Sequence, residues 1–161
     1  MPKPRVYVET TIPNLYHETR TAPESVEARL WTRAWWADAA DCYELLTSIV
    51  VLRELGQGTS SRAALRTALL DGIPVLGDSS PIPEIVSVYL QHKLMPSNPP
   101  SDAYHLAVAS YYRCDFIATW NCRHLANPRK ALHIRRINTM LGLPVPSLRT
   151  PKDLLLRRDD E

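Results

Sequence analysis

The chain has 161 residues, 45% of them hydrophobic and 22% charged, which is enough for one compact domain with a buried core. Its formal net charge of +2 excludes a strong overall basic field, so any surface that binds nucleic acid must be local. No apolar run approaches the roughly 20 residues that cross a bilayer, and "MPKPRVYVE" lacks the apolar segment of a signal peptide. We therefore expect a cytoplasmic protein without membrane contact, with a single domain over residues 1–156 and a charged tail at 157–161.

The cysteines do not indicate a disulfide framework. Cys42, Cys114 and Cys122 are odd in number and form no close pair, which favours buried free thiols. A zinc site that combined Cys114, Cys122 and His124 would lack a fourth ligand at the spacing of a structural site.

The first half of the chain predicts alternating strands and helices. The β-branched and aromatic residues of "VYV" suit a buried strand that Glu9 ends, and a short helix starts at Ile12-Pro13. A long helix follows from Pro23, and "CYELLTS" then reads as a strand closed by Ser48, which can cap the helix "IVVLRELGQG". Three tryptophans lie at helical spacing in the long helix and indicate core packing or a dimer face: Trp31, Trp35 and Trp36.

The second half continues the alternation. A capped helix and a short apolar segment occupy "TSSRAALRTALLDGIPVLG", and a further helix occupies "SPIPEIVSVYLQ". The segment "SDAYHLAVASYYRC" is helical again, with Ser101 able to cap it and Asp102 in its first turn, where the helix dipole favours an anion. "DFIATW" is a second buried strand, a basic helix restarts near Pro128, and "PVPSLRTPKDLLL" adds a last strand and helical turn.

This order of elements predicts an α/β sandwich with a mostly parallel sheet. Polar residues at the carboxyl ends of such strands face the crevice where ligands bind. Glu9 follows the first strand, and Thr119 and Asn121 follow the strand "DFIATW", so we expect them at this crevice. Asp115 begins that strand instead and is expected at the opposite edge in a structural role.

Three acids from separate elements form a candidate site for a hard cation: Glu9, Glu54 and Asp102. Each also has a simpler interpretation. Glu54 emerges beside the apolar Val50 and Val51 but could be an ordinary surface glutamate or pair with an arginine. Asp102 could serve only its helix dipole, and Glu9 could be an ordinary acid at a strand end. Together they supply the carboxylate oxygens that Mg²⁺ and Mn²⁺ prefer.

With these residues in view, the chain resembles the PIN domain family, whose best-known small members are VapC-type toxins. The matching segments, in the family's order, are "VYVETT", "VVLRELGQG", "SDAYHLAVA" and "CDFIATWNCRHL". The resemblance implies a Rossmann-like three-layer α/β/α sandwich and a Mg²⁺- or Mn²⁺-dependent ribonuclease that hydrolyses RNA phosphodiester bonds. A VapC-like toxin of a type II toxin–antitoxin system would act on RNA and bind a cognate antitoxin protein, and a homodimer is also compatible.

Residue by residue, the resemblance implies that Glu9, Glu54 and Asp102 are metal ligands and, with Asn121, the catalytic residues. The predicted supporting residues are Thr10, Thr11, Thr119 and His124. A basic segment after the strand "DFIATW" would lie near the rim of the crevice, where Arg123, Arg129 and Lys130 are predicted to contact nucleic acid. A solvated basic face is the simpler interpretation of these charges. Trp120 could stack on a base or close the core.

Two positions depart from the family pattern. Glu9 stands where the family has aspartate, which lengthens the reach of the carboxylate by roughly 1.5 Å. Asn121 stands where many members have a fourth acid, so the site carries less negative charge. The alternative function is therefore a catalytically weak or inactive PIN-like module that binds RNA or a protein partner. A small-molecule phosphatase or nucleotide-binding domain is disfavoured, because no glycine-rich phosphate loop follows "VYVE".

Overall fold

The computed structural model describes residues 2–57, 61–122, 125 and 127–159. The element order alternates strands and helices: β1 (Arg5–Val8), α1 (Thr11–Tyr16), α2 (Pro23–Cys42), β2 (Glu44–Ser48), α3 (Ile49–Leu55), α4 (Ser61–Leu69), β3 (Val75–Leu76), α5 (Pro81–Gln91), α6 (Ser101–Tyr111), β4 (Phe116–Ala118), α7 (Pro128–Met140), β5 (Ser147–Arg149) and α8 (Pro151–Asp159). No helix of the described residues has the length and apolar character to cross a membrane.

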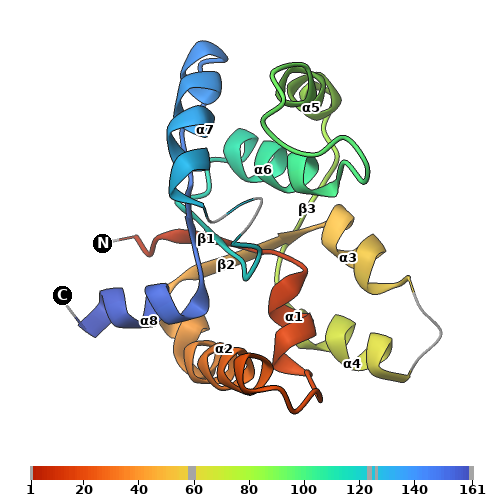
Figure 1. The fold of residues 1–161 in the computed structure, drawn as a ribbon, viewed down its shortest axis with the longest axis vertical. Coiled ribbons are helices and arrows are strands. Elements are labelled where there is room, and N and C mark those ends of the chain that lie inside the picture. The colour runs from red at the N-terminus through yellow and green to blue at the C-terminus, as the bar shows by residue number, and fades with distance from the viewer. Residues whose placement is uncertain (1, 58–60, 123–124, 126, 160–161) are drawn as a thin grey trace.

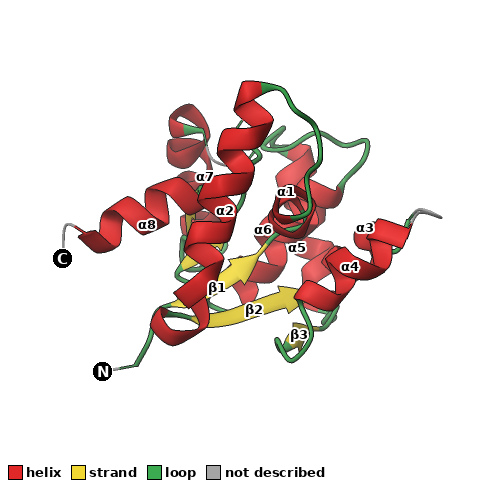
Figure 2. Cartoon of the chain, turned by 90° about the horizontal axis from the view of Figure 1, so that it is seen from below, coloured by secondary structure: helices red, strands yellow, loops and turns green. Residues whose placement is uncertain are grey.

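The strands form one five-stranded sheet in the order β3-β2-β1-β4-β5, and every pairing is parallel. Helices α5, α6 and α7 lie on one side of the sheet, and α1, α2 and α8 lie on the other (Figures 1 and 2). The predicted three-layer α/β/α sandwich is therefore confirmed, with a sheet that is wholly parallel. The order places β1 at the centre, with Tyr7 opposite Leu46 of β2 and Ile117 of β4.

The central strands carry the core because helices cover both of their faces, as is typical of parallel sheets. Val6, Tyr7 and Val8 are fully buried in β1. Helix α6 adds small side chains to the same core, including the fully buried Ala103 and Ala107. Trp35 of α2 is fully buried as well, so this tryptophan belongs to the core and not to an exposed dimer face.

Two local expectations are settled by the ends of the helices. Ser48 caps α3 as predicted, because its Oγ accepts a hydrogen bond from the N–H of Val51 at 3.3 Å. The predicted cap at Ser101 is wrong, since Pro100 holds the N-cap position and Ser101 is the first helical residue.

Helix α8 runs past residue 156, and Arg157 lies over the ring of Phe116 of β4, 4.9 Å from its centroid.

Candidate functional site

Polar residues lie at the carboxyl ends of three neighbouring strands. Ser48 is the last residue of β2, Glu9 follows β1 and Thr119 follows β4. The N–H of Glu9 donates to the carbonyl of Ala118 at 3.2 Å, which holds the ends of β1 and β4 together. The carboxyl edge of a parallel sheet is where ligands bind in open α/β folds, so this edge is the candidate site.

Glu9 is buried at this edge, with 4% of its surface exposed. Its Oε1 accepts hydrogen bonds from the N–H of Thr11 at 3.1 Å, the Thr11 hydroxyl at 2.5 Å and the Thr119 hydroxyl at 2.7 Å. Oε2 accepts no hydrogen bond from the described residues, and no basic side chain among them pairs with Glu9. Neutral donors therefore fix one oxygen of a buried carboxylate and leave the other available to a ligand.

Glu54 of α3 is held by two side chains from other elements. Its Oε1 lies 2.6 Å from Nε2 of His105 in α6 and accepts the Thr10 hydroxyl at 2.8 Å. The Glu54 side chain is 30% exposed, whereas that of His105 is 1% exposed. The carboxylate thus reaches from the surface helix to a buried imidazole.

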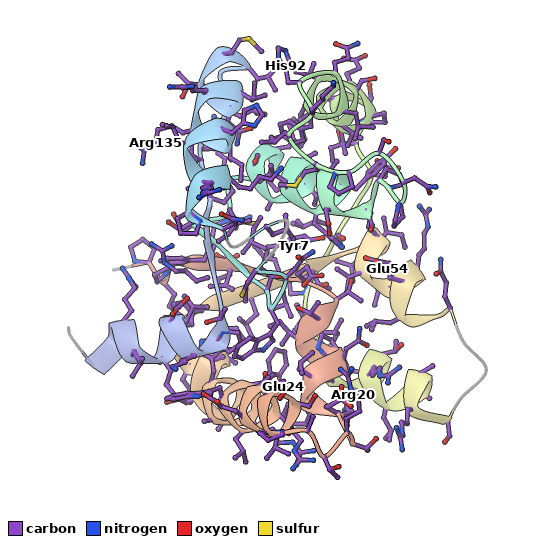
Figure 3. All side chains as sticks on the ribbon, in the orientation of Figure 1. Tyr7, Arg20, Glu24, Glu54, His92 and Arg135 are labelled. Atoms are coloured by element: carbon purple, nitrogen blue, oxygen red, sulfur yellow. The ribbon has the colours of Figure 1, made fainter. Side chains whose placement is uncertain are left out.

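His105 continues into a buried chain of hydrogen bonds. Its Nδ1 lies 2.7 Å from the hydroxyl of Tyr7, which lies 2.7 Å from Oγ of Ser48. Figure 3 shows Tyr7 in the middle of the molecule, with Glu54 on α3 to its side. These contacts link β1, β2, α3 and α6 at the candidate site in one buried polar network.

The charges in this network shift three pKa values. Burial alone would lower the pKa of His105, but the Glu54 hydrogen bond and the charges of Glu9, Glu54 and Asp102 raise it above its ordinary value. Burial alone would raise the pKa of Glu54, but His105, Thr10 and Ser101 lower it. Burial raises the pKa of the Tyr7 phenol well above its ordinary value, and Glu9 and Glu54 add to this effect. These directions favour an imidazolium beside a carboxylate, in which both ring nitrogens donate.

Asp102, the third predicted acid, contacts the side-chain amide of Asn121. Nδ2 of Asn121 lies 3.2 Å from both carboxylate oxygens of Asp102, in the first turn of α6. The N–H of Asn121 donates to Oγ1 of Thr119 at 2.9 Å, so Thr119 contacts both Glu9 and Asn121. The structure thus connects the predicted residues of β1, β4 and α6 in one hydrogen-bonded region.

The side chains of this region carry carboxylate, amide and hydroxyl oxygens. These are the atom types that bind a hard divalent cation. All three acids raise the pKa of His105, and Glu54 contacts its Nε2 directly. Within the described ranges, however, no three His, Cys, Asp or Glu side chains stand grouped closely enough to hold a metal ion. Among the described residues, Glu9, Glu54 and Asp102 therefore do not form a complete set of metal ligands in this structure.

The other predicted residues divide into three groups. Thr10 donates to Glu54 and Thr11 donates to Glu9, so each of these threonines contacts one of the predicted acids. Lys130 donates to the carbonyl of Leu94, which ties α7 to the segment after α5, whereas Arg129 is exposed near the start of α7. The predicted roles of Arg123 and His124 lie outside the described residues.

Two further side chains settle open interpretations. The indole N–H of Trp120 donates to Oγ1 of Thr32 in α2 at 2.7 Å, so Trp120 is fixed against the helical layer. Asp115 accepts the N–H of Arg5 through Oδ2 at 2.8 Å and lies at the opposite edge of the sheet, in the expected structural role.

His105 is the central residue that sequence reasoning missed. It lies in the quoted segment "SDAYHLAVA", three residues after Asp102 and among small apolar residues. That spacing puts His105 on the same helical face as Asp102. This shared face is the feature of the sequence that could have identified His105 as a site residue.

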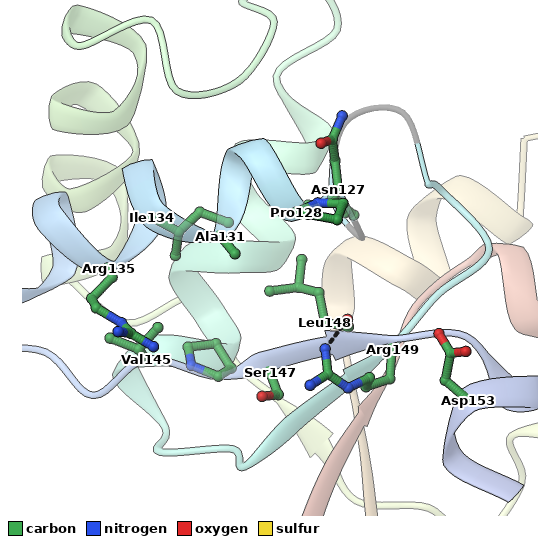
Figure 4. A pocket seen from close by; sticks show the side chains of 12 residues that line it. Asn127, Pro128, Ala131, Ile134, Arg135, Val145, Ser147, Leu148, Arg149 and Asp153 are labelled. Carbon is green, nitrogen blue, oxygen red and sulfur yellow. Dashed lines mark hydrogen bonds between the residues drawn. The ribbon is translucent and has the colours of Figure 1, made fainter. Parts of the chain in front are cut away.

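Two cavities flank the sheet. One, of about 450 Å³, lies between α3, the segment after β3 and the start of α6, and Glu54 and Ser101 form part of its wall. The other, of about 440 Å³, runs between α7 and the edge strand β5, with Arg135 near one end and Arg149 near the other (Figure 4). Arg149 turns back along its own strand, where Nη1 donates to the carbonyl of Leu148 at 3.3 Å. Of these two cavities, the one beside α3 has a candidate site acid, Glu54, in its wall.

Comparisons of the chain with protein-family models, with curated proteins and with solved structures find no match.

Proposed function

We propose that the chain is a metal-dependent ribonuclease whose Mg²⁺ or Mn²⁺ ion is held by Glu9, Glu54 and Asp102. The observation that carries the proposal is the Glu9 carboxylate, which is 4% exposed and contacts only neutral donors among the described residues. Buried charges in proteins are normally paired or coordinate metals. A divalent cation at the carboxyl edge of the sheet would supply this positive charge.

The surrounding side chains suit that role. A bound ion would supply a nucleophilic water near neutral pH and stabilise charge on the phosphodiester. Thr11 and Thr119 fix one oxygen of Glu9, and Thr10 and His105 fix one oxygen of Glu54. Such contacts orient ligands and lower the cost of ordering them.

The Asn121 amide has a separate role in the proposal. It contacts both carboxylate oxygens of Asp102 through Nδ2 and would help to orient that acid. The smaller negative charge at this position supports one ion more than two.

The biological role proposed is that of a VapC-like toxin with a cognate antitoxin. The four motifs of the PIN resemblance support this part, together with the wholly parallel sheet. Expression of the chain should slow cell growth, and expression of the Asp102→Asn variant should not. Equal growth with both would count against a toxin role even if the purified protein cleaves RNA.

One observation favours the alternative of a weakly active or inactive binding module. The acids are not grouped as a finished ligand set within the described residues, and the amide nitrogen of Asn121 faces Asp102. In that case the fold would bind RNA or a protein partner without hydrolysis. Metal binding separates the two functions, because only the ribonuclease needs it.

The test compares RNA cleavage by the wild type with cleavage by Glu9→Gln and Asp102→Asn, in Mn²⁺ and in EDTA. Glu44→Gln is the matched control, because Glu44 is an exposed acid at the opposite edge of the sheet. We expect cleavage by the wild type and the control in Mn²⁺, none in EDTA, and a loss of at least about 100-fold in the two site variants. Equal cleavage by the wild type and Asp102→Asn would indicate contamination and overturn the proposal.

A further inference from the structure

The cavity beside Glu54 has a polar lining that the fold itself does not use. Arg53 and Gln57 come from α3, and Asp78 comes from the segment after β3. All three are exposed, and none makes a side-chain hydrogen bond or ion pair with another described residue. The lining thus offers a guanidinium, an amide and a carboxylate whose hydrogen-bonding capacity is open to a ligand.

The same cavity has an aromatic and apolar side. Tyr104 of α6 is half-buried and contributes to the wall together with Val50 of α3 and Pro100. No described residue hydrogen-bonds its hydroxyl. A tyrosine ring beside polar side chains is the arrangement by which proteins stack an unpaired base and read its edge.

The position of the cavity connects it to the candidate site. Glu54 is part of its wall, and Tyr104 lies between Asp102 and His105 in the sequence of α6. A ligand in the cavity therefore lies next to one of the acids proposed to hold the metal. Its volume of about 450 Å³ is within the ordinary range of small-molecule sites.

We propose that this cavity binds a guanine base of single-stranded RNA, next to the phosphodiester that the acids would cleave; the inference rests on the proposed ribonuclease function. Guanine presents two acceptors, N7 and O6, that suit the fork of Arg53, and an N2 amino donor that suits Asp78. Adenine lacks the O6 acceptor, and the pyrimidines lack the N7 and O6 pair. Tyr104 stacks on the base, and Gln57 completes the polar edge.

The first experiment needs no catalysis. The four ribonucleoside 5′-monophosphates are titrated separately into the protein in EDTA, and amide shifts are followed by NMR. Because all four share the phosphate, differences among them report the base. We expect guanosine monophosphate to bind most tightly and to shift the amides of Val50, Arg53 and Tyr104. Equal binding of all four, tighter binding of another base, or shifts elsewhere would overturn the assignment.

Variants then test the contacts. Tyr104→Ala should weaken guanosine monophosphate about tenfold or more, whereas Tyr104→Phe keeps the ring and most of the affinity. Asp78→Asn and Arg53→Met should each reduce the preference for guanine. Tyr111→Ala, at the other end of α6, is the matched control and should leave binding unchanged. Unchanged binding in Tyr104→Ala would contradict the proposal.

Guanine binding and RNA cleavage can each be present without the other, so the two proposals can fail separately. If the protein binds guanine but no preparation cleaves RNA, the base site is supported and the proposed ribonuclease function is contradicted. RNA cleavage without base-selective shifts, or with cleavage sites that do not favour guanine, would leave the ribonuclease standing and remove the base site.

Discussion

Nε2 of His105 lies 2.6 Å from Oε1 of Glu54, so a buried residue of α6 holds a carboxylate of α3 at the candidate site. The imidazole is 1% exposed, and its other nitrogen contacts the Tyr7 hydroxyl of the central strand. A short charge-assisted hydrogen bond of this kind is stronger than a neutral one. The position of Glu54 is therefore set by the core of the protein as well as by its own helix.

Replacement of His105 by alanine should destabilise the protein by about 2–5 kcal/mol, because it leaves a cavity and removes the partner of both Glu54 and Tyr7. His105→Gln retains a side-chain amide that can donate to Glu54, so its loss should be clearly smaller. The free energy of unfolding in urea measures both. His92→Gln, at an exposed position after α5, is the control and should change stability by less than about 0.5 kcal/mol. Equal losses in the alanine and glutamine variants would contradict a role for the hydrogen bond.

The His105–Glu54 pair should make stability depend on pH at both ends of a defined window. The pKa of His105 is raised above 6.5, so its contribution is full below pH 6.5 and is lost as pH rises through the folded-state value. The pKa of Glu54 is lowered below 4.5, so its contribution is full above pH 4.5 and is lost as pH falls through the folded-state value. The pair therefore stabilises the fold fully between these two ordinary values.

The difference in unfolding free energy between the wild type and His105→Gln, measured across pH, reports this window. It should be largest between pH 4.5 and pH 6.5 and should decline on both sides. The imidazole C–H shift of His105 in NMR spectra should titrate above pH 6.5. A titration midpoint below that value would show that burial outweighs the acids.

Thr119→Val should disturb Glu9 without changing the shape of the core. The valine keeps the branched side chain but removes the hydroxyl that donates to Oε1 of Glu9 and accepts the N–H of Asn121. We expect a loss of about 1–3 kcal/mol in unfolding free energy and weaker Mn²⁺ binding by calorimetry. Thr119→Ser is the control, because it keeps the hydroxyl. If the serine variant lost as much Mn²⁺ affinity as the valine variant, the methyl group and not the hydroxyl would be responsible.

The fold was largely predictable from local patterns. The apolar "VYV" run, the Ser48 cap and the Pro-Glu start of α2 each reflect backbone preferences that sequence carries directly. Position at the carboxyl end of a strand then placed Glu9 and Thr119 correctly at one edge of the sheet. The cap at Ser101 failed because its neighbour Pro100 took the N-cap position, and serine favours a cap only on average.

The side-chain pairings of the site were not predictable in the same way. His105 reads as one more buried residue of an apolar helix, because its partners Tyr7 and Glu54 lie on elements far away in sequence. The strand pattern predicted that Tyr7 is buried, but the partner of a buried hydroxyl depends on the packing of two other elements. Such contacts follow from tertiary structure, and residue type and spacing do not determine them.

The most direct test of the metal site is a crystal of the wild-type protein soaked in Mn²⁺, with anomalous difference density measured at the carboxyl edge of the sheet. The proposed metal site predicts one peak within bonding distance of carboxylate oxygens from Glu9, Glu54 and Asp102, and no peak in Glu9→Gln crystals soaked in the same way. The absence of a peak at millimolar Mn²⁺, or an equal peak in the variant, would contradict it.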